Sequence, residues 1–158
     1  MGKLLWHTMM SLDGFIAGPN DDMSWAFGMD AGSRETVDTV LSSTGALLVG
    51  RRTQDVEDRL QPGFYGGAFR GPFFVLRHDP PPEPPVVKGV TGRFLDVGIE
   101  EAVTIAREAA DGGDVVILGA NILHRGFRDI GVGFAHGTPQ GGNPSGAIYT
   151  TDFGLRVQ

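Results

Sequence analysis

The chain has 158 residues, of which 41% are hydrophobic and 20% are charged, and it contains no cysteine. This composition is typical of a globular protein with enough length for one hydrophobic core, and it excludes a disulfide scaffold or a thiolate metal site. A net charge of −6 and scattered arginines argue against nucleic-acid binding, although a local arginine cluster can still bind a small anion.

The N-terminal residues show no signal-peptide pattern, and no run of about 18 apolar residues occurs. We therefore expect no membrane-spanning helix and take the cytoplasm as the default location. Residues 1–158 are expected to form a single domain, with a loop-rich, atypical stretch over 131–158 where glycines concentrate.

The first quarter of the chain predicts a strand, a loop and a helix. Lys3 to Met10 has strand-like composition. Ser11 to Gly18 places two glycines around a short apolar run, which is typical of a loop whose backbone lies close to another group. Apolar residues at helical spacing predict a helix from about Asp30 to Leu41, which Gly45 is expected to end.

A buried strand followed by a basic turn is the main feature of the middle of the chain. Ala46 to Val49 is continuously apolar, and Gly50, Arg51, Arg52 and Thr53 follow it, at the expected start of a helix that reaches Leu60. Glycine permits close approach, guanidinium groups suit phosphate oxygens, and a helix N-terminus offers free N–H groups. The segment therefore predicts a phosphate site, with a solvated basic turn as the alternative.

Strands and helices continue to alternate in the second half. Arg77 and His78 follow a strand over Pro72–Leu76, so that basic groups again stand at the carboxyl end of a strand, where open α/β sheets bind ligands. This alternation predicts a three-layer α/β/α sandwich with a mainly parallel sheet. The other expected elements are strands over Arg93–Val97 and Val115–Leu118, and helices over Ile99–Ala110 and Ile122–Phe127.

Four motifs in order resemble the dihydrofolate reductase-like superfamily, in particular its bacterial branch related to the reductase (RibD C-terminal) domain of riboflavin biosynthesis. The resemblance covers roughly the first 130 residues. The motifs that carry it are Ser11-Leu12-Asp13-Gly14-Phe15-Ile16-Ala17-Gly18, Leu48-Val49-Gly50-Arg51-Arg52-Thr53, Phe74-Val75-Leu76 and Val115-Val116-Ile117-Leu118-Gly119-Ala120-Asn121.

The resemblance implies an NADPH-dependent reductase acting on a small planar heterocycle, pterin-like or similar to a riboflavin-precursor pyrimidine. It implies that residues 50–53 bind the cofactor phosphates and that Leu76, Arg77 and His78 approach the adenosine 2′-phosphate. It places Gly119, Ala120, Asn121 and Ile122 beside the nicotinamide and pyrophosphate. No metal is expected, and a homodimer is what the family implies.

The substrate residues are suggested by the same resemblance. An acid five residues after a tryptophan contacts the pterin in folate-reducing members, and Trp25 and Asp30 keep that spacing. Asp30 is therefore either a substrate anchor and proton relay or an ordinary helix-cap aspartate, and Asp13 is either structural or adjacent to substrate. His7, His124 and His136 lack metal-ligand spacing and are expected to be packed or solvated.

Two departures from the family pattern favour other functions. Leu118 stands where the family has the first of two glycines, so its side chain is expected to crowd the pyrophosphate. After Gly131 the usual strands are replaced by turn composition, and only Ala147 to Thr151 predicts a last short strand, so we expect an incomplete sheet with an open edge. The alternatives are a non-catalytic nucleotide-binding homologue and a phosphate-binding enzyme that uses no nicotinamide.

Overall fold

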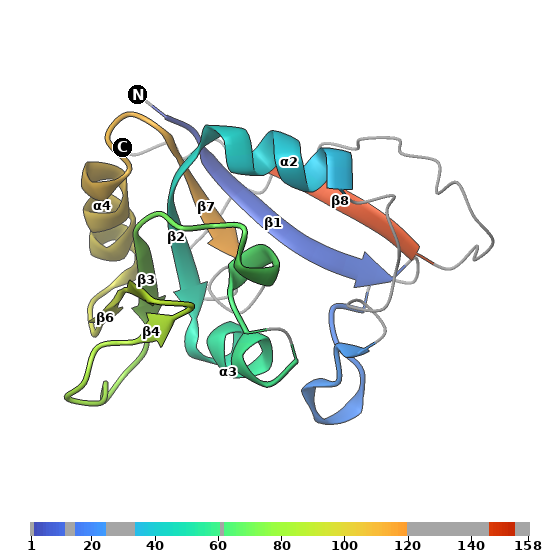
Figure 1. The fold of residues 1–158 in the computed structure, drawn as a ribbon, viewed down its shortest axis with the longest axis horizontal. Helices are drawn as coiled ribbons and strands as arrows, with labels where there is room; N and C mark the ends of the chain where they lie inside the picture. Colours follow the sequence, from blue (N-terminus) through green and yellow to red (C-terminus); the bar gives the residue numbers. More distant parts are fainter. Residues whose placement is uncertain (1, 12–14, 25–33, 61, 120–145, 154–158) are drawn as a thin grey trace.

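A six-stranded sheet in the order β6-β3-β2-β7-β1-β8 forms the centre of the protein (Figure 1). The computed structural model describes residues 2–11, 15–24, 34–60, 62–119 and 146–153. The strands are β1 (Leu4–Ser11), β2 (Thr44–Gly50), β3 (Phe73–Leu76), β6 (Arg93–Leu95), β7 (Asp114–Leu118) and β8 (Gly146–Phe153). All neighbouring strands pair in parallel except β8, which is antiparallel to β1. This confirms the predicted α/β fold with a mainly parallel sheet.

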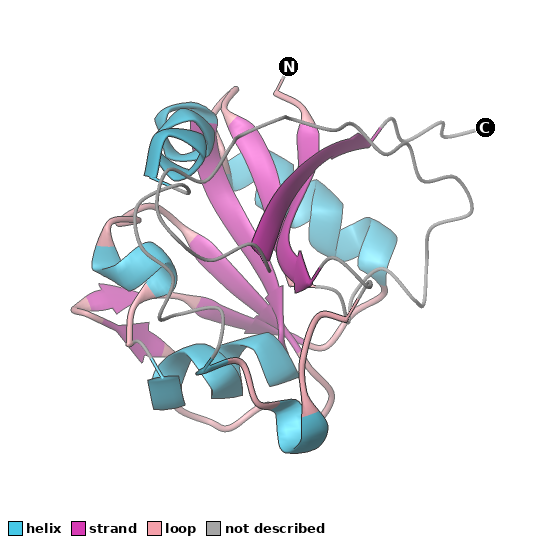
Figure 2. Cartoon of the chain, turned by 90° about the vertical axis from the view of Figure 1, so that its right-hand side faces the viewer, coloured by secondary structure: helices cyan, strands magenta, loops and turns pink. Residues whose placement is uncertain are grey.

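Helices lie on both faces of the twisted sheet (Figure 2). They are α2 (Arg34–Ser43), α3 (Arg51–Leu60) and α4 (Ile99–Ala109), with short 3₁₀ turns η1 (Pro19–Asp21) and η2 (Phe64–Gly67). On one face, α4 contributes Ala102, Val103 and Ala106 to a first core cluster with apolar residues of β1, β2, β3, β6 and β7. On the other face, Val40 of α2 and Phe64 of η2 join a second core cluster with residues of β1, β2, β3 and β7.

The interior strands are buried on both faces, as their sequences predict. Leu47, Leu48 and Val49 of β2 are fully buried, and they alternate between the two core clusters. Val115, Val116 and Ile117 of β7 do the same. Continuous apolar runs rather than alternating ones are what a parallel sheet covered on both faces requires.

One boundary expectation is wrong. Helix α2 ends at Ser43, and Gly45 lies inside β2 rather than at the helix end. A Cβ on Gly45 would meet the main chain of Ala110, so the glycine allows the start of β2 to lie close to the end of α4.

Strand β8 pairs with β1 from Leu4–Phe153 to Ser11–Gly146 and forms one end of the sheet, so the expected open edge stays a prediction. The expected short strand at 147–151 is therefore part of a longer one. A small hairpin, β4 (Val86–Val87) and β5 (Val90–Thr91), was not predicted. Its two turn residues, Lys88 and Gly89, have positive φ angles of 49° and 80°, which is the backbone that a tight hairpin turn needs.

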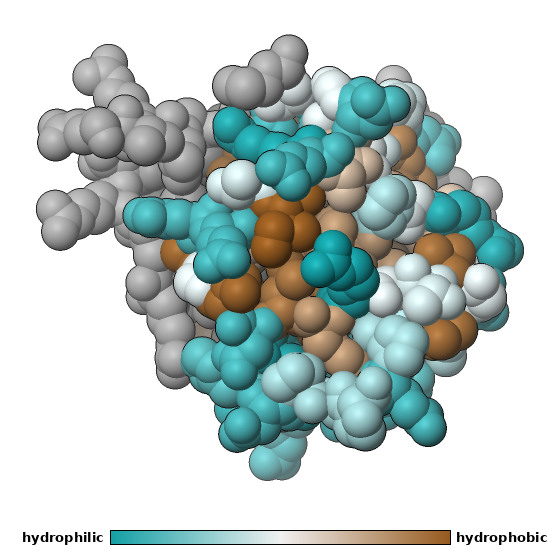
Figure 3. Space-filling view, turned by 90° about the vertical axis from the view of Figure 1, so that its left-hand side faces the viewer, coloured by the Kyte–Doolittle hydropathy of each residue, from teal (hydrophilic) through white to brown (hydrophobic). Residues whose placement is uncertain are grey.

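Hydrophilic side chains surround smaller apolar areas on the face seen in Figure 3. Within the described residues, the most exposed large apolar side chains are Phe15 and Val86, at 65% and 61% of their full accessibility. No helix in the described ranges is long and apolar enough to cross a bilayer.

Candidate functional site

The strand register brings the predicted phosphate-binding segments to one edge of the sheet. Gly50 at the end of β2 pairs with Leu76 at the end of β3, and Val49 pairs with Leu118 at the end of β7. Leu118 also pairs with His7 of β1. Since these strands are parallel, the segments that follow β2, β3 and β7 start from the same carboxyl edge.

The basic segment after β2 forms the first turn of α3, which begins at Arg51. Arg51 and Arg52 are exposed at this helix N-terminus, where backbone N–H groups and the helix dipole favour an anion. The Arg51 guanidinium donates to Asp55 Oδ2 at 3.0 Å, and both side chains are about half exposed. An exposed pair of this kind is weak, so a phosphate can compete for Arg51.

Gly119 joins the turn after β7 to both β1 and α3. Its N–H donates to the carbonyl oxygen of His7 at 3.0 Å, and its carbonyl accepts from Trp6 Nε1 at 2.9 Å. Its φ angle is +80°, and a Cβ built there would lie 3.1 Å from Thr53 Cγ2 and closer still to Thr53 Oγ1. The two glycine-containing turns predicted to bind phosphate are therefore in direct contact.

Leu118 points to a face of the sheet rather than to its carboxyl edge. Its side chain is partly buried against the second core cluster, as the alternation along β7 requires. The expected crowding of a pyrophosphate by this side chain stays a prediction.

The basic group after β3 lies beside an aromatic ring. The Arg77 guanidinium stacks over Phe94 at 5.4 Å from the ring centroid. Its Nε is buried, with no hydrogen-bond partner in the part of the chain that the structure describes. His78 Nδ1 lies 2.8 Å from Asp96 Oδ1 in an exposed pair. The Arg77 guanidinium therefore keeps a permanent positive charge close to the end of β3, although its Nε is covered from solvent.

The inner face of α3 is polar. In α4 the buried residues Ala102, Val103 and Ala106 stand at positions i, i+1 and i+4. The residues of α3 with the same spacing are Thr53, Gln54 and Glu57. Thr53 contacts Gly119, Gln54 is buried, and Glu57 Oε2 is buried without a hydrogen-bond partner among the described residues. No residue of α3 belongs to the two core clusters found among the described residues.

Burial raises the pKa of Glu57 to about 7, and the negative charge of Asp58 adds to the shift. The carboxyl group is therefore about half protonated at neutral pH. Burial, and after it the charge of Glu57, also raises the pKa of Tyr65, so the two side chains lie close enough to interact electrostatically.

His7 and Tyr65 form a buried pair on the same side of the sheet. His7 Nδ1 lies 2.7 Å from the Tyr65 hydroxyl, and the rings stack at 5.4 Å between centroids. His7 is 5% exposed, and burial lowers its pKa to about 4, so the imidazole is neutral at pH 7. Tyr65 has a φ angle of +55°, which is uncommon for a residue with a side chain.

The sequence missed Trp6, Glu57 and Tyr65 and expected His7 only to be packed or solvated. The polar i, i+1, i+4 pattern of α3 was the available signal for Glu57. Trp6 and Tyr65 carried no such signal in the sequence, because their hydrogen-bond partners lie 113 and 58 residues away.

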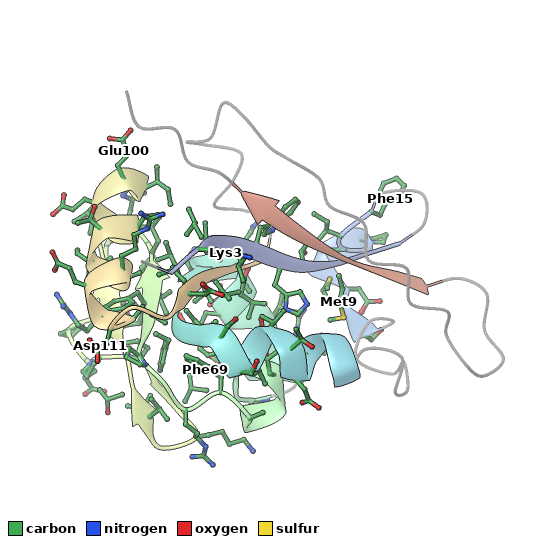
Figure 4. The ribbon with its side chains drawn as sticks, turned by 90° about the horizontal axis from the view of Figure 1, so that it is seen from above. Lys3, Met9, Phe15, Phe69, Glu100 and Asp111 are labelled. Atoms are coloured by element: carbon green, nitrogen blue, oxygen red, sulfur yellow. The ribbon has the colours of Figure 1, made fainter. Side chains whose placement is uncertain are left out.

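Seen from above, β1 runs from Lys3 past Met9 toward Phe15 (Figure 4).

The predicted substrate residues Asp13, Trp25 and Asp30 lie outside the described residues, as do Ala120, Asn121 and Ile122. His124, His136 and the expected helix over Ile122–Phe127 lie outside them as well. Among the side chains that the structure does describe, no three metal-ligating groups come together.

Comparison with known proteins gave a family and a fold. The model of the RibD C-terminal domain family matches residues 2–132. A crystal structure named "Putative riboflavin biosynthesis protein", from Shewanella sp. PV-4, is similar with a TM-score of 0.55 and 17% sequence identity. The similarity covers 75% of this chain and 65% of the Shewanella chain. A search of curated proteins gave no match.

Proposed function

Because the chain belongs to the RibD C-terminal domain family, we propose that it is an NADPH-dependent reductase. The proposed reaction is hydride transfer to a small planar heterocycle, either pterin-like or similar to a riboflavin-precursor pyrimidine. The observation that carries the proposal is the contact of Gly119 with Thr53, because it joins the turns after β7 and β2 at one edge of the sheet. A cytoplasmic homodimer is part of the same proposal.

The residues at this edge fit a dinucleotide phosphate. Gly50, Arg51, Arg52 and Thr53 would hold phosphate oxygens at the N-terminus of α3, with Gly119 opposite. Leu76 and Arg77 would lie at the 2′-phosphate, where the permanent positive charge of Arg77 would favour the anion. Ala120, Asn121 and Ile122 complete the proposed cofactor site. When bound, NADPH would supply the hydride.

The acceptor would be oriented by residues on the face of the sheet near α2 and α3. We keep Trp25 and Asp30 as proposed substrate contacts and Asp13 as a further candidate. Orientation of the acceptor is the protein's main contribution to such a reaction, because a hydride moves only between closely stacked partners.

Titration of the purified protein with NADPH and NADH tests the proposal. We expect micromolar NADPH binding, detected by calorimetry or nicotinamide fluorescence, and a clear preference over NADH. Failure of both nucleotides to bind would refute the reductase.

Leu118 favours a second candidate, a nucleotide-binding homologue without catalysis. A leucine at a position where the family has glycine leaves less room beside the cofactor, although its side chain packs against the second core cluster. NADPH binding without turnover of any pterin or pyrimidine would support this candidate. Binding of phosphorylated ligands but not of NADPH would instead support a phosphate-binding enzyme.

A further inference from the structure

The inner face of α3 buries polar side chains, and burial of polar groups lowers the stability of the fold. Such a face indicates a functional role. A buried polar group without a partner loses the hydrogen bonds that it makes to water in the unfolded chain, and native proteins keep few such groups. Glu57 Oε2 is such a group. It stands one helical turn after Thr53, the residue that contacts Gly119.

The surroundings of Glu57 favour its neutral form. The charged neighbour on its own helix is Asp58, which raises the pKa of Glu57. From η2 it is faced by the Tyr65 phenol, and Tyr65 is in turn bonded to the neutral His7 of β1. A carboxylic acid in these surroundings can hold a proton on one oxygen and donate it.

We propose that Glu57 is the proton-donating acid of the acceptor site, and that it binds a ring nitrogen or carbonyl oxygen of a planar heterocycle. The proposal rests on the proposed function, and it places the acid on α3 rather than at Asp30. The geometry behind it is the buried, unpartnered oxygen on a polar helix face beside the glycine turn after β7.

Hydride and proton addition balance in atoms and electrons when the acceptor contains a C=N bond. In the proposed step a C–H bond of the reduced nicotinamide would break, and its hydride would form a C–H bond at the acceptor carbon while the π electrons pass to nitrogen. Nitrogen would take the proton from the Glu57 carboxyl group, which leaves a carboxylate and the oxidised cofactor. The carboxylate would then take up a proton from a hydronium ion of the solvent.

The position of Tyr65 and His7 suggests how Glu57 keeps its proton. Their rings stack and their polar atoms satisfy each other, and His7 is neutral, so the pair presents no cation to the carboxyl group. Tyr65 and His7 are positioning residues in this scheme, and the Glu57 carboxyl group is the one expected to touch the acceptor.

The first measurement is a carboxyl-carbon NMR titration of the full protein labelled in glutamate. One signal should titrate near pH 7, should vanish in Glu57→Gln and should remain in Glu108→Gln, an exposed glutamate on α4. In Tyr65→Phe the titration of that signal should shift. Ordinary titration of every glutamate would overturn the proposal.

The second measurement uses dihydrofolate as the probe acceptor, with NADPH affinity measured in parallel. Binding to the wild type and to Glu108→Gln should weaken about tenfold from pH 6 to pH 8, because one proton is required. Glu57→Gln should bind without this pH dependence, since its amide still donates a hydrogen bond, but it should not turn over. Glu57→Asp should restore part of the turnover.

The outcomes separate the two proposals. An unchanged pH dependence in Glu57→Gln, with normal NADPH binding, overturns the role of Glu57 and leaves the reductase standing. NADPH binding without any dihydrofolate binding at millimolar concentration overturns Glu57 as the acid for a pterin-type acceptor. Failure of the wild type to bind NADPH overturns both.

Discussion

Glu57 and His7 are expected to act on stability in opposite directions over the same pH range. The pKa of Glu57 rises from 4.5 to about 7 on folding, so the folded state binds the extra proton and stability falls as pH rises through this range. The pKa of His7 falls from 6.5 to about 4, so the unfolded state binds the extra proton and stability is lost as pH falls below 6.5. In the wild type the two effects nearly cancel between pH 4.5 and 6.5.

The substitution Glu57→Gln removes one of the two opposing effects. A gap of about two and a half pKa units corresponds to roughly 3 kcal/mol, at about 1.36 kcal/mol per unit. Relative to Glu57→Gln, the wild type should therefore lose roughly 3 kcal/mol of unfolding free energy between pH 4.5 and pH 7.5. The Gln variant itself should gain stability from pH 4.5 to 6.5, because His7 then acts alone.

Urea unfolding followed by circular dichroism at pH 4.5, 5.5, 6.5 and 7.5 measures this difference. Glu108→Gln, which removes an exposed carboxyl group from the surface of α4, serves as the matched control. Stability curves of wild type and Glu57→Gln that run parallel within about 0.5 kcal/mol would refute the reasoning, since they would mean that Glu57 titrates alike in both states.

Gly119→Ala should lower the free energy of unfolding by roughly 1–3 kcal/mol, because its φ is +80° and the new methyl group meets Thr53. Gly112→Ala, where φ is +86° but nothing lies within 4 Å, should cost less in the same urea assay, and equal losses would exclude a role for the contact. Arg51→Ala should weaken NADPH ten- to a hundredfold, roughly 1.5–3 kcal/mol, and NADH far less; equal losses by calorimetry would move the 2′-phosphate role away from Arg51. Tyr65→Phe should destabilise by roughly 1–3 kcal/mol by leaving His7 Nδ1 unpaired, whereas an unchanged melting temperature would show that the hydrogen bond contributes nothing.

The short-range features of the fold were predictable because local composition decides them. The short apolar runs of β2 and β7 are typical of buried strands, and the apolar stripe of α4 indicates a helix that packs on one face. Arg51, Arg52 and Thr53 were correctly expected at the start of a helix, because Gly50 ends an apolar run directly before them. These segments need no partner to reveal their type.

The pairing of distant segments was decided by the tertiary structure. Composition indicated a short strand near Ala147, but the full length of β8 follows from the free edge of β1, which offers hydrogen bonds to eight residues. The buried bond of His7 to Tyr65 depends on η2 crossing the face of β1, and no sequence spacing encodes that crossing.

Some features of the candidate site likewise follow from the local sequence, and others follow from tertiary packing. The sequence alone determined which residues are candidates for phosphate binding, since glycines and arginines at strand ends are a local pattern. The contact of Thr53 with Gly119 and the burial of Glu57 depended on how α3 packs on the sheet. A pKa near 7 is a property of that packing, because only burial next to Asp58 makes an ordinary glutamate hold its proton.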